Sequence, residues 1–310
     1  IASAGPAMAG GDANAAKPVL WWSFDSQDKA AVRDVAGGVD DAIEGNFTYM
    51  PGPCGQAIKP DGYTTCIQRR SRRSFKLDQA LTVSAWVAPA AYPWNWCPVI
   101  ACEDPQGWGW RLAVGPHGDF ALELSVAGRR QQCMSDEFVM PLRRWTHIAG
   151  VYDPNQGITL YVNGKPAGRL AVKGKPDWAK PGRVRGLMNY EKVKPSNLYR
   201  DYGTLASWFS VDGAVDEVKV YDVALPAEQI QADATPANKD ALAGAALPRR
   251  KMPIGPQGAG RFGAYYCNLK YYPEWDNLWS VDKDTDVIVR FDQSATRVVF
   301  WRGSRYSPAW

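Results

Sequence analysis

Alternating apolar and polar residues run through most of the chain up to residue 232 and predict short β-strands. The clearest example reads Leu-Thr-Val-Ser-Ala-Trp-Val from Leu81 to Val87. Because successive side chains of a strand point to opposite faces, Leu81, Val83, Ala85 and Val87 share one face. We expect a sandwich strand that is buried on one side. Similar stretches, each bounded by Gly, Pro, Asp or Asn, predict strands at residues 19–24, 110–114, 120–126, 145–152 and 215–221.

One β-hairpin is predicted directly from its turn. Residues 158–162 alternate between apolar and polar side chains, Asn163-Gly164 follows, and residues 165–170 lead back. Asn-Gly is typical of the two-residue type I′ turn, whose central residues both need a positive φ. Further along, Pro226 marks the start of a short helix through Ile230, because proline is favoured in the first turn of a helix.

The last quarter of the chain has a different pattern. Residues 233–260 are rich in Ala, Pro, Gly and charged residues without a sustained apolar period, which predicts a linker. Residues 261–272, 286–291 and 297–301 are strand-like, and residues 292–296 supply a turn. Since a few strands rarely bury a core alone, we expect the segment 261–310 either to dock on the preceding domain or to begin a further, propeller-like catalytic module.

Composition narrows the class of protein. A length of 310 residues suits one large domain, here residues 18–232, and a smaller module. The formal net charge of +4, without a nucleic-acid-reading motif, argues against a nucleic-acid partner. No apolar run approaches the roughly 20 residues needed to span a bilayer. Residues 1–17 are rich in Ala and Gly, as expected for disordered residues downstream of a removed export signal, and they predict a secreted, periplasmic or cell-surface protein.

Six cysteines are spread among the predicted strands without the paired CxxC spacing of a zinc site. Disulfides are the favoured interpretation. Cys54 with Cys66 would close a short loop, and Cys97 or Cys102 would reach Cys133 across neighbouring strands. Cys267 lies far from the others in the sequence. Reduced cysteines packed in the core remain the alternative.

Three stretches together resemble the laminin G-like domains, which are concanavalin A-like jelly-rolls. They are Leu81-Thr-Val-Ser-Ala-Trp-Val87, then Trp145-Thr-His-Ile-Ala-Gly-Val-Tyr152 leading to Leu160-Tyr-Val-Asn-Gly-Lys165, and finally Gly213-Ala-Val-Asp-Glu-Val-Lys-Val-Tyr221 followed by Ala224-Leu-Pro-Ala-Glu-Gln-Ile230. The resemblance implies an all-β fold, an antiparallel β-sandwich followed by a short β-rich C-terminal segment. It also implies a module that holds carbohydrate or protein ligands, as in secreted carbohydrate-active proteins.

The same resemblance implies a structural calcium ion, because members of this broad family often hold one near the first and last strands. Asp25, at the end of the first predicted strand, and Asp216, within the last, are the positions carried over, with backbone carbonyls completing the ligands. The alternative is that Asp25 caps a turn and Asp216 pairs with a nearby arginine.

Two groups of residues are candidate contacts for carbohydrate. Flat aromatic faces stack on the apolar C–H faces of sugar rings, and indole N–H groups donate hydrogen bonds. Clustered arginines attract anionic glycans. The candidates are Trp94, Trp96, Trp108, Trp110, Arg69, Arg70, Arg72 and Arg73. The alternatives are that the tryptophans pack beneath loops and that the arginines form a solvated edge.

Catalytic motifs are sparse. No Gly-x-Ser-x-Gly elbow, phosphate loop or His-rich metal motif occurs; His147 is expected to pack within its strand, and His117 to be exposed. Residues 286–306 look like the opening of a β-rich module of a polysaccharide lyase. A lyase needs a cation for the substrate carboxylate and a base for the neighbouring proton. The candidates of those types in the C-terminal segment 261–310 are Tyr265, Tyr266, Arg302, Arg305 and Tyr306.

Two hypotheses follow. In the first, the jelly-roll binds or supports an anionic polysaccharide for a secreted protein that cleaves it by β-elimination, with the cleaving part in the remainder of the same polypeptide or in a partner chain. In the second, the chain is a non-catalytic adhesion or protein-interaction module that uses its aromatic C-terminal strands.

Overall fold

The computed structural model describes residues 16–28, 30–62, 64–69, 75–93, 95–180, 182–190 and 209–247, together with the backbone of residues 270–271, 300–302 and 305–307. Most of the described chain is antiparallel β-sheet. The first strands are β1 (Leu20–Trp22), β2 (Ala31–Asp34), β3 (Val39–Glu44), β4 (Phe47–Gly52), β5 (Gly55–Pro60), β6 (Cys66–Gln68), β7 (Leu81–Pro89), β8 (Tyr92–Pro93), β9 (Cys97–Glu103), β10 (Gly109–Val114), β11 (Phe120–Val126) and β12 (Arg129–Met134).

The remaining elements follow in the second half of the chain. They are β13 (Thr146–Asp153), β14 (Gly157–Val162), β15 (Lys165–Leu170), β16 (Arg183–Gly186), β17 (Met188–Asn189), β18 (Phe209–Ser210), β19 (Gly213–Tyr221), α1 (Ala227–Asp233), the 3-10 helix η1 (Lys239–Leu242), β20 (Lys270–Tyr271), β21 (Phe300–Arg302) and β22 (Arg305–Ser307).

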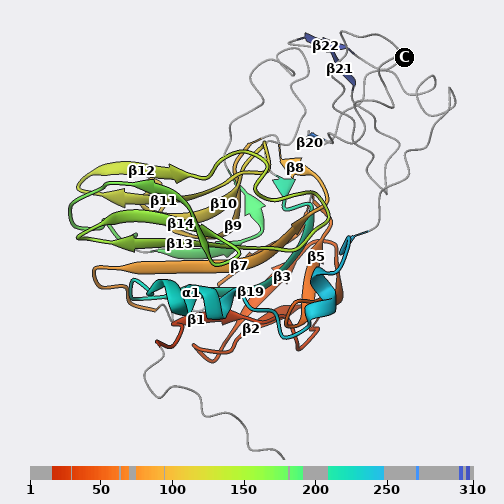
Figure 1. Cartoon of the computed structure of the whole chain (residues 1–310), viewed down its shortest axis with the longest axis horizontal. Coiled ribbons are helices and arrows are strands. Elements are labelled where there is room, and N and C mark those ends of the chain that lie inside the picture. Colours follow the sequence, from red (N-terminus) through yellow and green to blue (C-terminus); the bar gives the residue numbers. More distant parts are fainter. Residues whose placement is uncertain are drawn as a thin grey trace, which may run out of the picture.

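One continuous antiparallel sheet curves back on itself to form a sandwich (Figure 1). Its strand order is β12-β11-β10-β9-β16-β6-β3-β2-β1-β19-β7-β13-β14-β15, with β4 and β5 attached beside β19. We call the strands from β12 to β3 the front layer and those from β2 to β15 the back layer. Strands β11 and β12 contact β13, β14 and β15 across the interior, so the two layers face each other. The predicted antiparallel β-sandwich is confirmed.

The central back-layer strand β7 shows both the success and the limit of the sequence pattern. Leu81, Val83, Ala85 and Val87 are fully buried in the core between the layers, as predicted. The opposite face of β7, which the pattern leaves to solvent, is also buried, and Trp86 is only 1% exposed. The prediction of a half-buried strand is therefore wrong, because the chain that follows β19 covers this outer face.

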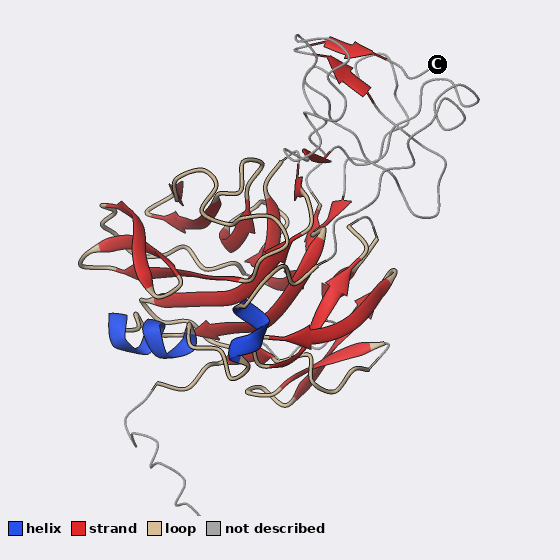
Figure 2. Cartoon of the chain, turned by 45° about the vertical axis from the view of Figure 1, so that its right-hand side comes forward, coloured by secondary structure: helices blue, strands red, loops and turns tan. Residues whose placement is uncertain are grey.

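The cover consists of α1 and residues 234–247 (Figure 2). Ile230 of α1 packs with Ala149 and Val151 on the outer face of β13. Leu247, only 3% exposed, packs in the same cluster as Trp86. Residues 234–247, which the sequence predicts to be part of a linker, thus lie against the sandwich and bury apolar area that strongly favours the packed state.

The predicted hairpin is confirmed. β14 pairs with β15 in antiparallel register, with Val162 opposite Lys165. The two turn residues have positive φ, +49° at Asn163 and +78° at Gly164, as a type I′ turn requires. The short helix is confirmed as well, because Pro226 occupies the N-cap of α1 and contributes no backbone N–H that would need a partner.

The disulfide prediction is wrong for the described residues. Cys54, Cys66, Cys97, Cys102 and Cys133 are all thiols. Cys97 and Cys102 lie on β9, whereas Cys133 lies on β12, and β10 and β11 stand between them. Three strand spacings amount to about 14 Å, twice the Cα separation a disulfide tolerates. Cys54 and Cys66 belong to different layers, beside β19 and on β6 respectively.

Little of the C-terminal segment belongs to the described residues. The backbone of β20 pairs with that of β8, and β21 pairs with β22, so that Arg302 stands opposite Arg305 and Trp301 opposite Tyr306. The predicted strand at residues 286–291 and the turn at 292–296 lie outside the described residues, as do Cys267 and residues 1–15. In the part of the chain that is described, no helix is both long and apolar enough to cross a membrane.

Candidate functional site

The outer face of the front layer carries a continuous row of mainly polar side chains. Directly opposed residues of an antiparallel pair point to the same side of the sheet. The strand registers therefore align one residue from each of seven strands on the face away from the core. In strand order from β3 to β12 the row is Ala42, Gln68, Arg185, Ala101, Arg111, Glu123 and Gln132. Seven strands span roughly 29 Å, which is long enough for an extended ligand.

A second row lies two residues along the same strands, with Arg183 opposite Glu103 on β16 and β9 and Ser125 opposite Arg130 on β11 and β12. Ion pairs join it to the first row. Arg111 Nε donates to Glu123 Oε1 at 2.8 Å, and Arg130 Nε donates to Glu123 Oε2 at 2.7 Å. Arg130 Nη2 also reaches Glu103 Oε1 at 2.6 Å. Glu123 is only 4% exposed, so its charge must be compensated, and the two arginines do this with charge-assisted hydrogen bonds. The network fixes Arg130 at the surface.

Tyr190 supplies an exposed aromatic ring next to the first row. The residue is 38% exposed, and its ring is held from two sides. The guanidinium of Arg185 lies 4.7 Å from the ring centroid, and Gln68 Nε2 donates to the Tyr190 hydroxyl at 3.0 Å. A cation over one face and a hydrogen bond at the tip restrict the ring without covering all of it. Burial raises the pKa of Tyr190, so the hydroxyl stays protonated.

This surface, which we call the front face, has an excess of positive charge. Its two rows contain four arginines (Arg111, Arg130, Arg183 and Arg185) and two glutamates (Glu103 and Glu123), a difference of two positive charges. Arg183 stands opposite Glu103, and Arg185 is opposite the small Ala101. The small neighbour leaves room above Arg185. The combination of fixed cations, amides and an aromatic ring is suited to hydroxylated, negatively charged ligands.

The structure separates the predicted tryptophans. Trp110 is 1% exposed and lies in the core, because the inward face of β10 carries Trp110, Leu112 and Val114. Its ring is therefore a packing residue, which corrects the prediction that it contacts carbohydrate. Trp108 is 38% exposed in the loop between β9 and β10, beside the Gly107 carbonyl that Arg130 also contacts. Trp96 is half-buried next to Gly115, and Trp94 lies outside the described residues.

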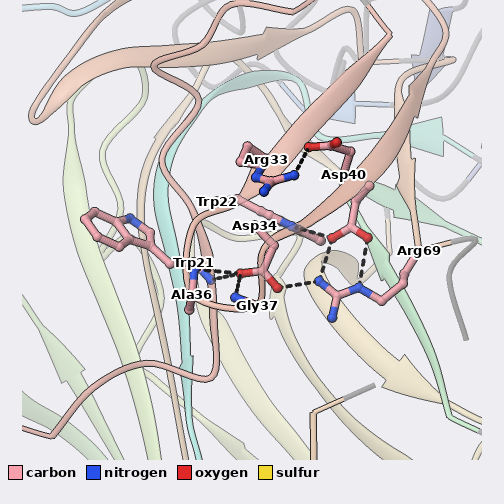
Figure 3. Close-up of polar contacts among 9 residues, drawn as sticks. Trp21, Trp22, Arg33, Asp34, Ala36, Gly37, Asp40 and Arg69 are labelled. Atoms are coloured by element: carbon pink, nitrogen blue, oxygen red, sulfur yellow. Dashed lines mark hydrogen bonds and ion pairs between the residues drawn. The ribbon is translucent and has the colours of Figure 1, made fainter. Parts of the chain in front are cut away.

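Arg69 has a structural role rather than an exposed one. Its Nε donates to Asp41 Oδ1 at 2.8 Å, and its Nη2 donates to Asp41 Oδ2 and to Asp34 Oδ2, both at 2.7 Å (Figure 3). The side chains are 4% exposed for Arg69 and 0% for both aspartates. Burial alone lowers the pKa of Arg69, but the two carboxylates outweigh it and the pKa is raised. The buried guanidinium corrects the prediction that Arg69 attracts a glycan; Arg70, Arg72 and Arg73 lie outside the described residues.

The two aspartates predicted to hold calcium meet at the turn between β4 and β5. Asp25 Oδ1 accepts a hydrogen bond from the Gln56 backbone N–H at 2.9 Å, and Asp216 Oδ2 accepts one from Cys54 at 3.0 Å. The turn approaches so closely because it contains glycines. A Cβ at Gly52 would lie 2.4 Å from Asp216 Oδ2, and one at Gly55, whose φ is +84°, would lie 2.1 Å from Asp25 Oδ1.

Asp216 is a buried carboxylate in a negative environment. Burial raises its pKa to about 8, and the charges of Glu217 and Asp25 contribute in the same direction. Lys219 Nζ lies 2.8 Å from Glu217 Oε2 and neutralises that neighbour rather than Asp216. The predicted alternative, an arginine partner for Asp216, finds no support among the ion pairs of the described residues.

The carboxylate oxygens of Asp25 and Asp216 are of the type that binds a hard divalent cation. Calcium prefers carboxylate oxygens as ligands. A bound cation would favour the charged form of Asp216 and so lower its raised pKa. No group of three or more His, Cys, Asp or Glu side chains among the described residues is arranged to hold a metal. Asp25 and Asp216 would therefore need backbone carbonyls to complete the coordination.

The predicted catalytic residues cannot be assembled into a site. Arg302, Arg305 and Tyr306 are placed only as backbone of the β21–β22 pair, and Tyr265 and Tyr266 lie outside the described residues. The histidine predictions are confirmed. His117 is exposed, with 55% of its side chain accessible, and His147 is buried with its ring 5.3 Å from that of Trp86. Burial lowers the pKa of His147 to about 3, so it stays neutral.

The sequence patterns missed most of the front face. Arg111, Glu123 and Gln132 belong to different strands and become one row only through the pairing register. A partial signal exists, because a charged residue between apolar neighbours, as in Leu122-Glu-Leu124, marks the outward position of a strand. It does not indicate which strands are adjacent.

Comparisons with known proteins agree with this architecture. A family model described as the concanavalin A-like lectin/glucanases superfamily matches residues 61–231, more than half of the chain. No curated protein matches the sequence. Among solved structures, domain 4 of AbnA, a GH43 extracellular arabinanase from Geobacillus stearothermophilus, in complex with arabinotriose, is similar with a TM-score of 0.53 and 19% identity, covering 71% of this chain and 98% of that one.

A second similar structure is the binding domain of botulinum neurotoxin serotype G. Its TM-score is 0.50 at 10% identity, and the match covers 70% of this chain and 50% of that one. At such low identity both structures establish a shared fold and nothing about shared ligands.

Proposed function

Because this chain belongs to the concanavalin A-like lectin/glucanases superfamily, we propose that it is the carbohydrate-binding module of a secreted polysaccharide-degrading protein. The front face is the proposed binding surface. The observation that carries the proposal is the seven-strand polar row, with the restrained, partly exposed ring of Tyr190 against its Gln68 and Arg185. A domain of an extracellular arabinanase with a similar fold, in complex with arabinotriose, supports a carbohydrate as the class of ligand.

The charge of the front face favours an acidic polysaccharide. Uronate or sulfate groups would pair with Arg185 and Arg183, whereas the sugar ring would stack on Tyr190. Arg111 is 8% exposed and acts through Glu123, which holds Arg130 in place. Arg183, which is exposed, and Arg185, which is half-buried, therefore attract the anionic groups, and the buried Arg111–Glu123 pair makes the surface rigid. Trp108, at the loop end of the same layer, is a second candidate ring for stacking.

The binding test is affinity electrophoresis of the full chain in gels containing polygalacturonate, alginate, arabinan or xylan. We expect retardation in the two acidic polysaccharides, weakened by salt. Tyr190→Ala and Arg185→Gln should each raise the apparent Kd about tenfold, which corresponds to about 1.4 kcal/mol.

A matched control is Arg33→Gln. Arg33 is also exposed, but it lies on β2 and pairs with Asp40. This variant should migrate like the wild type. If all three variants are retarded as strongly as the wild type, the front face is not the binding surface. If none of the four polysaccharides retards the wild type, the chain does not bind this class of carbohydrate.

The proposal includes a calcium ion that stabilises the folded chain. Asp25 and Asp216 would hold the ion with backbone carbonyls of the adjoining turns, and the bound charge would tie β1 and β19 to the β4–β5 turn. Its role is stability, since ligand that binds only the folded state raises the melting temperature. Thermal unfolding in calcium chloride and in EDTA tests this: the wild type should gain stability with calcium, and Asp216→Asn should not.

Cleavage of the acidic polysaccharide by β-elimination is the part of the proposal that depends on the C-terminal segment. Arg302, Arg305, Tyr306, Tyr265 and Tyr266 are its candidate residues, with arginine neutralising the uronate carboxylate and tyrosine removing the adjacent proton. Ultraviolet absorbance of unsaturated products from polygalacturonate or alginate measures it. Binding without any absorbance increase would reject cleavage by this chain and leave the binding proposal intact.

A further inference from the structure

A hollow beside β4 is lined by residue types that sugar sites use. It measures about 580 Å³ and is lined by Gln27, Gly45, Asn46, Phe47, Thr48 and Tyr49. Five of these residues belong to β4 and the turn before it. β4 pairs with β5, which in turn pairs with β19 of the back layer, and none of the lining residues belongs to the front-face rows on β3 to β12.

The chemistry of the lining differs from that of the front face. All six residues are uncharged: two carry aromatic rings, two carry amides, and Thr48 carries a hydroxyl. Sugar rings present both apolar C–H groups and hydroxyls, and each hydroxyl can donate and accept a hydrogen bond. Aromatic rings beside amide groups match both properties. Because no arginine or lysine lines the hollow, it offers no cation to a carboxylate or sulfate group.

The aromatic wall of the hollow is fixed before any ligand arrives. Phe47 and Tyr49 alternate along β4 and meet edge to face, with centroids 5.7 Å apart and ring planes at 87°. The Tyr49 hydroxyl donates to the backbone carbonyl of Asp28. Burial raises the pKa of Tyr49 to about 12, which keeps this donor protonated. A wall that is already rigid loses little entropy when it binds a ligand.

The turn that carries Asn46 is fixed as well. Asn46 donates its backbone N–H to Thr64 Oγ1 at 3.0 Å, and its carbonyl accepts from Thr65 Oγ1 at 2.6 Å. Gly45 has a φ of +90°, and a Cβ there would lie 2.2 Å from the Thr64 carbonyl oxygen. With its backbone held by the two threonines, Asn46 has an exposed side-chain amide at the rim of the hollow.

We propose that this hollow is a second carbohydrate-binding site, which takes an uncharged sugar unit. Phe47 and Tyr49 contact the apolar face of the ring, and the amides of Asn46 and Gln27 bind its hydroxyls. The site does not require the front face to bind, because its residues come from other strands. A module with one charged and one uncharged site holds polysaccharides that contain both acidic and neutral sugars more tightly than either site alone.

The test is a titration of the isotope-labelled full chain, carrying Tyr190→Ala, with the neutral trisaccharides arabinotriose, xylotriose and maltotriose, followed by backbone amide NMR. At least one should produce saturable shifts at residues 45–49. Asn46→Ala and Gln27→Ala each remove one hydrogen-bonding side chain and should weaken that binding about fivefold. Asn155→Ala, at an exposed asparagine in the β13–β14 turn, is the matched control and should leave the Kd unchanged.

The outcomes separate this site from the proposed function. Shifts at residues 45–49 that weaken with Asn46→Ala support the second site even if acidic polysaccharides fail to bind the wild type. No shift there with any of the three trisaccharides, or shifts that Asn46→Ala and Gln27→Ala leave unchanged, would overturn it. Tighter binding of trigalacturonate than of the neutral trisaccharides at residues 45–49 would also overturn it, because the lining has no cation.

Discussion

Arg69→Met is the substitution that most directly tests how the two layers are joined. Arg69 follows β6, Asp34 ends β2 and Asp41 lies on β3, where the sheet passes from the front layer to the back layer. Methionine has a similar length and no charge. The variant removes one cation from between two carboxylates that are 0% exposed.

The magnitude follows from the contacts that are lost and kept. Three charge-assisted hydrogen bonds of 2.7–2.8 Å disappear. Asp34 keeps the backbone N–H groups of Trp21, Ala36 and Gly37, and Asp41 keeps the indole N–H of Trp22. Since each aspartate keeps some donors, we take the middle of the range for breaking a buried ion pair, about 4 kcal/mol. For a folded unit of this size the melting temperature should fall by roughly 8 to 16 °C.

Urea unfolding followed by tryptophan fluorescence, with thermal unfolding by circular dichroism, measures this change. Arg33→Met is the matched control, because Arg33 pairs with Asp40 on the same two strands with both side chains more than half exposed. An exposed pair contributes about 0–1 kcal/mol. If Arg69→Met costs no more than Arg33→Met, the reasoning fails, and Arg69 returns as a candidate contact for anionic glycans.

Three further predictions concern stability. Burial lowers the pKa of His147 to about 3, so the contribution of neutral His147 to the free energy of unfolding is complete above pH 6.5. This contribution falls by about 1.4 kcal/mol per pH unit as the pH drops from 6.5 towards 3. Urea unfolding of His147→Phe should lack this dependence, and an unchanged acid slope would contradict the prediction. The pKa of Asp216 is raised to about 8, which has the opposite effect. Without calcium, the free energy of unfolding should therefore fall as the pH rises from about 4 to 8. If urea unfolding of Asp216→Asn shows the same dependence on pH, Asp216 is not its cause. Gly150→Ala should lower the free energy of unfolding by about 1–3 kcal/mol, because the new Cβ would lie 2.7 Å from Leu122 Cβ of the facing layer. Gly244→Ala, with open space around the new Cβ, should leave the stability unchanged. Equal melting temperatures of the two variants would refute the packing argument.

Local signals along the chain were enough to predict the fold class. The two-residue period placed Leu81, Val83, Ala85 and Val87 in the core, and Asn163-Gly164 identified a turn whose positive φ values few other residues tolerate. These features depend on residues close together in the sequence, and elementary backbone geometry therefore determines them.

Features that depend on which strands become neighbours needed the tertiary structure. Cys97 or Cys102 was expected to reach Cys133, yet two strands lie between β9 and β12. Trp86 was expected on the open face of β7, yet Ala241, Ala246 and Leu247 pack against it. The front-face row exists only because the register places Arg185 in line with Ala101 and Arg111. The period of a strand states which residues share a face, but pairing between distant strands is set by the packing of the whole core, and that is where the candidate site arises.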